Sequence, residues 1–98
     1  MIMPGLARQA PPAACEVVVI GGGIAGLSVA YELARRGVRG VVVLEAAHPG
    51  VGASGRNGEL IRSAFASREW GTLFDLSLRK WHGLAAELEA NTLFTRAG

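Results

Sequence analysis

The sequence predicts an α/β fold in which two parallel strands are joined by a helix, and three observations support this. Residues 17–20 and 41–44 are short apolar runs, mostly valine, without a polar break, and each is typical of a strand buried on both faces. Between them, apolar residues at helical spacing from Leu27 to Ala34 predict a helix. Gly37 follows this helix, at the position where a left-handed C-cap favours glycine.

The turn from the first strand into the helix carries the pattern G-x-G-x-x-G at Gly21, Gly23 and Gly26. In a βαβ nucleotide site, the first glycine permits the sharp turn and the second lets a pyrophosphate approach the backbone. The third glycine lets the helix pack close to the sheet. We expect the first helical turn, at Ile24 and Ala25, to offer unpaired N–H groups and the positive end of the helix dipole to phosphate.

Glu45 ends the second strand, 24 residues after Gly21. A carboxylate at this spacing accepts hydrogen bonds from a ribose diol and repels a 2′-phosphate, which argues against NADP. The whole arrangement favours a dinucleotide site over the alternative that the glycines serve only close packing. The predicted fold class is therefore α/β, a Rossmann-like βαβ dinucleotide-binding fold of which this chain holds the N-terminal part.

Composition narrows the possible functions. The chain has 98 residues, 50% of them hydrophobic and 18% charged, which suits one small globular domain. A net charge of +2 without a run of Lys or Arg does not indicate nucleic-acid binding, and no apolar run approaches the ~20 residues of a membrane span. The single cysteine, Cys15, favours a reducing compartment, and we expect the cytoplasm. His48 and His82 lack metal-ligand spacing, so no metal site is predicted.

The organisation along the chain is uneven. Residues 1–14 are rich in Pro and Ala and predict a flexible arm, whereas residues 15–98 predict the N-terminal part of a nucleotide-binding domain. Residues 68–89 predict one long helix, and residues 93–98 the start of a third strand. Because a dinucleotide fold usually needs more strands, we expect a fragment that lacks the substrate domain and is poorly stable alone.

The predicted long helix carries a stripe of residues at three- and four-residue spacing, which we interpret as a packing surface. The stripe comprises Trp70, Leu73, Phe74, Ser77, Trp81, Leu84 and Leu88.

Residues 46–58, directly after Glu45, form a glycine-rich loop with polar side chains at Ser54, Arg56 and Asn57. A plain surface loop would explain the composition. Its position just beyond the carboxyl end of a parallel strand favours contact with a ligand instead, because ligands bind at that edge of the sheet.

The glycine turn, the VLE ending of the second strand and the segment GASGRNGELIRSAF together resemble the family of FAD-dependent amine oxidases. That family includes sarcosine oxidase, glycine oxidase and D-amino-acid oxidase. The resemblance covers residues 16–98 and, within the family, is greatest to the β subunits of heterotetrameric sarcosine oxidases. It departs from the family pattern at Ala46 and Ala47, where many relatives carry a charged residue, and at Glu59, where relatives often have Gly or Thr.

The resemblance implies FAD as the cofactor. The three glycines of the turn would hold its pyrophosphate, and Glu45 its adenosine ribose. The loop residues Ser54, Gly55, Arg56 and Asn57 would run along the flavin side. Arg62 matches an arginine that holds the substrate carboxylate, a role that suits the bidentate guanidinium, although an ordinary ion pair would also explain it.

The implied function is FAD-dependent oxidation of the C–N bond of a secondary amine or amino acid such as sarcosine. The implied partners are a small-molecule substrate and other subunits of a hetero-oligomer. Two alternatives remain at this stage. One is an NAD-dependent dehydrogenase, which the glycine pattern permits, and the other is a truncated nucleotide-binding fragment without catalysis.

Overall fold

A computed structural model describes residues 10–64 and 66–95 of the chain. The chain divides into two compact units, Met1–Gly58 and Glu59–Gly98. Within the part described, no helix is both long and apolar enough to cross a membrane. Of the predicted flexible arm, residues 1–9 lie outside the described residues, and residues 10–14 contain neither helix nor strand.

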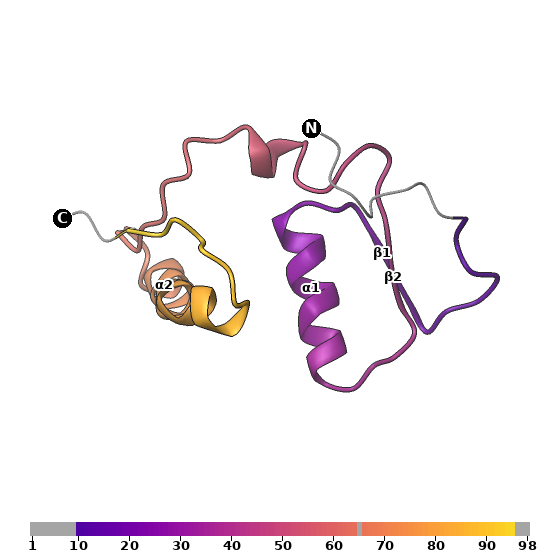
Figure 1. Cartoon of the computed structure of the whole chain (residues 1–98). Helices are drawn as coiled ribbons and strands as arrows, with labels where there is room; N and C mark the ends of the chain where they lie inside the picture. The colour runs from indigo at the N-terminus through magenta and orange to yellow at the C-terminus, as the bar shows by residue number, and fades with distance from the viewer. Residues whose placement is uncertain (1–9, 65, 96–98) are drawn as a thin grey trace. The chain divides into compact units, whose positions relative to one another are not determined.

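The first unit is a βαβ motif, as predicted. Strand β1 (Val17–Ile20) leads into helix α1 (Ile24–Arg35), which returns the chain to strand β2 (Val41–Leu44). The two strands pair in parallel, with Val17 opposite Val41 and Ile20 opposite Leu44. Helix α1 runs alongside both strands (Figure 1). This arrangement confirms the predicted α/β fold class with parallel strands.

Glycines set the geometry of the connection between β1 and α1. Gly21 adopts a φ of +102°, which L side chains rarely tolerate, and its N–H donates to the carbonyl of Leu44 over 2.8 Å. A Cβ added to Gly26 would lie 2.0 Å from the carbonyl oxygen of Gly21 and 3.2 Å from Cγ1 of Val19. The close-packing role predicted for Gly26 is therefore confirmed. Gly37, with a φ of +88°, follows the helix as expected of a C-cap glycine.

The prediction that both strands are buried on both faces is wrong for this chain. Residues Val17 and Val19 of β1 are half-buried, whereas Val18 is 48% exposed and Ile20 is 87% exposed. Side chains of a strand alternate between the two faces of the sheet, and α1 packs on only one of them. Among the described residues no apolar side chain is fully buried, because the described part of the first unit holds one α-helix, α1, and this helix covers one face of the sheet.

The second unit contains one long helix, α2 (Arg68–Glu87), in its described residues. Its start is capped by Ser67, whose Oγ accepts the N–H of Trp70. The predicted helix ran to Glu89, two residues too far. Leu88 forms the C-cap, and Glu89 has a φ of +51°, which cannot continue a right-handed helix.

The packing stripe predicted on α2 is confirmed in part. Its members Phe74, Trp81 and Leu84 are half-buried, together with Leu78, which was not predicted. The other predicted members are exposed: Trp70, Leu73, Ser77 and Leu88. The ring of Trp81 lies 6.0 Å from that of Phe94, which follows the helix. Contact with the returning chain, which periodicity alone cannot reveal, decides which positions are covered.

The third strand predicted at residues 93–98 does not form in the described part, residues 93–95. Residues 96–98 lie outside the described residues. Leu93 has a φ of +53°, which is incompatible with extended backbone, and Phe94 packs on Trp81 and His82. The β-propensity of residues 93–95 therefore does not produce a strand.

We expect Gly26→Ala to lower the free energy of unfolding by about 1–3 kcal/mol, because the added methyl group overlaps the carbonyl oxygen of Gly21. Gly83→Ala in α2 is the matched control. A Cβ there meets nothing within 4 Å, and the substitution should raise stability by about 1 kcal/mol through helix propensity. Urea titration followed by circular dichroism measures both. Equal effects of the two substitutions would contradict the steric explanation.

Candidate dinucleotide-binding site

The glycine turn and Glu45 meet at one edge of the sheet. Because β1 and β2 are parallel and Ile20 pairs with Leu44, both strands end at the same level. The residues that follow them, Gly21 and Glu45, therefore emerge side by side. In parallel sheets this carboxyl edge is where ligands bind.

Backbone N–H groups hold the Glu45 carboxylate in place. Its Oε2 accepts the N–H of Gly22 over 2.7 Å, and its Oε1 accepts the N–H of Ala47 over 2.9 Å. These bonds, that of Ala47 foremost, hold the pKa of Glu45 below its ordinary value because they favour the ionised form. A Cβ on Gly22 would lie 3.2 Å from three atoms of the Glu45 side chain. The carboxylate is thus seated directly against the glycine turn.

The loop after Glu45 returns to the same turn. The N–H of Gly50 donates to the carbonyl of Gly22 over 2.8 Å. The short 3₁₀ helix η1 (Ala53–Gly55) then brings Ser54 to the start of α1, where its Oγ accepts the N–H of Ile24 over 2.8 Å. These two contacts join the loop to the glycine turn, so the turn, Glu45 and the loop form one continuous structure.

The N-termini of helices α1 and α2 differ in their electrostatics. The N-cap of α1 is Gly23, which has no side chain, and its first turn contains no acidic residue. The first turn of α2 contains Glu69, whose carboxylate accepts the hydroxyl of Ser67. The positive end of the α1 dipole is therefore not offset by an acidic residue in its first turn. This chemistry fits a pyrophosphate.

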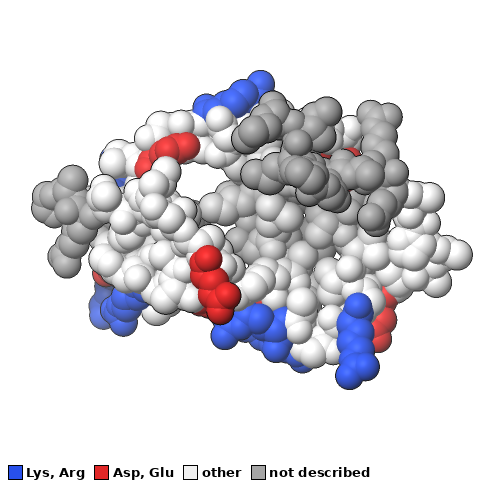
Figure 2. Space-filling model, viewed as in Figure 1, with Lys and Arg blue, Asp and Glu red and all other residues white. Residues whose placement is uncertain are grey.

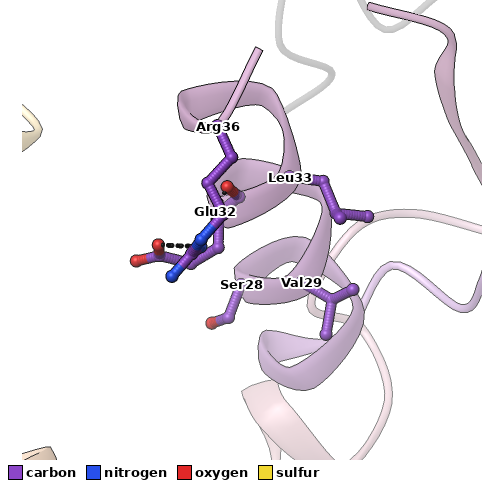
Figure 3. A pocket seen from close by; sticks show the side chains of 5 residues that line it. All are labelled: Ser28, Val29, Glu32, Leu33 and Arg36. Carbon is purple, nitrogen blue, oxygen red and sulfur yellow. Dashed lines mark hydrogen bonds and ion pairs between the residues drawn. The ribbon is translucent and has the colours of Figure 1, made fainter. Parts of the chain in front are cut away.

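The arginines at the far end of α1 serve the helix itself. Arg36 binds the carboxylate of Glu32 over 2.6 Å and the carbonyl of Glu32 over 3.0 Å, beside a shallow hollow on α1 (Figure 3). Elsewhere the described surface is largely uncharged on the face that Figure 2 displays. No group of three potential metal-ligating side chains exists among the residues described.

The structure brings most of the predicted site residues together in the first unit. Those in direct contact around the turn are Gly21, Gly23, Ile24, Gly26, Glu45 and Ser54. Ala25 lies in the first turn of α1. Gly55, Arg56 and Asn57 lie in or just after η1. Arg62 belongs to the second unit, where it is exposed in a segment without helix or strand, so its role toward a substrate carboxylate stays a prediction.

Sequence reasoning missed the backbone partners of the site. Gly22, the only fully buried residue in the described part of the chain, donates to Glu45 and accepts from Gly50. The uninterrupted run of three glycines at residues 21–23 was the available signal. A Cβ on Gly55 would lie 2.3 Å from the carbonyl oxygen of Gly50, so the glycines of the loop allow it to fold closely on itself.

Comparison with known proteins agrees with this geometry. Residues 16–98 match the family described as FAD dependent oxidoreductase. The chain is 33% identical over 96 residues to the sarcosine oxidase subunit beta of Rhizobium meliloti (strain 1021), covering 97% of this chain and 23% of that protein. It is 37% identical over 93 residues to the sarcosine oxidase subunit beta of Arthrobacter sp, covering 94% of this chain and 23% of that protein.

A third relative aligns over a shorter stretch. The gamma-glutamylputrescine oxidoreductase of Escherichia coli (strain K12) is 58% identical over 50 residues, covering 50% of this chain and 12% of that protein. No solved structure matches the chain significantly. The chain belongs to the family of FAD-dependent oxidoreductases, and it spans about a quarter of the length of the sarcosine oxidase β subunits that it matches.

We expect Glu45 to titrate below the ordinary range of glutamate, because its ionised form accepts the N–H groups of Ala47 and Gly22. The stability that this contact provides is then complete at neutral pH and is lost as the pH falls through the lowered pKa. Carbon-13 NMR of the side-chain carboxyl group measures the midpoint. Ser67→Ala is the control, because it removes the hydroxyl that donates to the carboxylate of Glu69. It should leave the titration midpoint of Glu45 unchanged. A midpoint at or above that of an unstructured peptide would show that these N–H groups do not hold the carboxylate.

Proposed function

We propose that the chain is the FAD-binding N-terminal part of an oxidoreductase. The proposed enzyme oxidises the C–N bond of a secondary amine or amino acid such as sarcosine. One observation carries the nucleotide part of this proposal. The N-terminus of α1, free of acidic residues in its first turn, opens beside a carboxylate at the carboxyl edge of a parallel sheet. The helix N-terminus would bind an anion and the carboxylate would bind a diol, and a dinucleotide contains both groups.

The residues of the site fit FAD by their chemistry. The glycine turn and the N–H groups of Ala25 and Gly26 in the first turn of α1 would hold the pyrophosphate, whereas the N–H of Ile24 already binds the hydroxyl of Ser54. The Glu45 carboxylate, already ionised and fixed by backbone donors, would accept the ribose hydroxyls. The loop residues from Ser54 to Asn57 would follow the cofactor toward its flavin. When bound, FAD supplies a two-electron acceptor for oxidation of the substrate C–H bond next to nitrogen.

The substrate part of the proposal is supported by the relatives. Two of them are sarcosine oxidase β subunits, and a third carries gamma-glutamylputrescine in its name, so the shared substrate chemistry is that of amines. Arg62 would bind the substrate carboxylate, because its guanidinium can form two parallel hydrogen bonds with it. The same β subunits support a role within a hetero-oligomer, and the single cysteine is the ground for proposing a cytoplasmic location.

Direct binding tests the proposed cofactor. We expect the chain to quench the fluorescence of added FAD and to bind NAD more weakly and NADP not at all, because the ionised Glu45 repels a 2′-phosphate. Glu45→Gln should weaken FAD binding roughly tenfold, since charged hydrogen-bond acceptors are the stronger ones. Glu69→Gln, which alters a carboxylate at the start of α2, should have no effect. Preference for NAD would support the dehydrogenase alternative, and binding of neither would leave a fragment without nucleotide function.

A further inference from the structure

Asn57 closes the short helix η1 with its side-chain amide nitrogen. Its Nδ2 donates to the carbonyl of Ala53 over 3.0 Å and to the carbonyl of Ser54 over 2.8 Å. A side-chain amide has two N–H donors, so both are engaged inside the loop. The Ala53 carbonyl also accepts the backbone N–H of Arg56 over 3.2 Å, so the amide of Asn57 adds a second donor at the end of this helical turn. Asn57 therefore acts as the C-terminal cap of η1.

The position of η1 decides where the Ser54 hydroxyl lies. Ser54 is the central residue of η1, and its Oγ accepts the N–H of Ile24, the first residue of α1, over 2.8 Å. A Cβ on Gly23 would lie 3.1 Å from the same Oγ, so the hydroxyl sits directly over the helix N-terminus. A short chain of contacts thus runs from the amide of Asn57 through η1 to the backbone of the glycine turn.

We propose that Asn57 is a positioning residue of the dinucleotide site: by capping η1 it holds the Ser54 hydroxyl against the N-terminus of α1. This inference rests on the proposed function for its consequence, which is tighter binding of FAD. It assigns Asn57 a role within the protein, in place of the direct cofactor contact that the sequence suggested. Arg56, whose Nε donates to the carbonyl of Gly52 over 3.3 Å, adds a second contact inside the same loop.

The geometric part is tested without any ligand. In nitrogen-15 NMR spectra of the whole chain, Ser54→Ala should shift the Ile24 amide, which loses its acceptor. Asn57→Ala and Asn57→Asp, both of which remove the two N–H donors, should shift the Ile24 amide in the same direction. The amide of Gly22, bound to Glu45, should move less. Asn91→Ala is the matched control, because its side chain accepts the N–H of Leu93 in the second unit.

The functional part is tested by FAD titration of the same variants. We expect Ser54→Ala and Asn57→Ala each to weaken FAD binding roughly fivefold, as the loss of one net hydrogen bond implies. The double variant should bind no more weakly than either single variant, because both substitutions break one chain of contacts. Additive losses would show that Asn57 acts on the ligand independently and would overturn the proposal.

The two proposals fail in different ways. If Asn57→Ala and Asn57→Asp leave the Ile24 amide at its wild-type position while Ser54→Ala moves it, the positioning role is wrong whatever the chain binds. If the wild-type chain binds no FAD, the proposed function fails, and the Ile24 shifts alone decide whether Asn57 positions Ser54.

Discussion

The rest of the first unit depends on the close approach of α1 to the turn that precedes it. The carbonyl oxygen of Gly21 occupies the space that a side chain on Gly26 would fill. This approach sets the start of α1 against the ends of both strands, and the bond from Gly21 N–H to the Leu44 carbonyl keeps those ends together. The helix N-terminus and Glu45 therefore meet at one edge of the sheet. A single steric condition thereby brings the two electrostatic features of the site together.

Those two features are of opposite sign and involve different N–H groups. The negative charge of Glu45 is balanced by the N–H groups of Gly22 and Ala47, which precede α1 or lie outside it. The first turn of α1 meets a neutral hydroxyl, that of Ser54, and no carboxylate. The dipole of α1 is therefore still able to attract an anion, while the carboxylate is still able to accept hydroxyl groups. This separation is what the proposed binding of a phosphate and a sugar at one small site requires.

The sequence predicted what local patterns determine. Valine runs, helical periodicity and glycine spacing located β1, α1 and β2, and the spacing of Glu45 from Gly21 placed both at one edge. What it could not predict depends on contacts between distant residues. The bond from Ile24 to Ser54 joins positions 30 residues apart. The exposure of Ile20 and the absence of a strand at residues 93–95 depend on whether another layer or another strand lies alongside, which no local pattern encodes.

The geometry of the site and the stability of the unit rest on different interactions. Glu45, Ser54 and the glycine turn are held by hydrogen bonds within the first unit, most of them to backbone atoms. The free energy of folding depends chiefly on apolar burial, and here Val18 and Ile20 remain exposed on the face of the sheet that α1 does not cover. Covering that face would add stability without altering any hydrogen bond at the carboxyl edge. The arrangement proposed to hold a dinucleotide is therefore encoded within residues 17–57, whereas its persistence depends on what packs against the opposite face of the sheet.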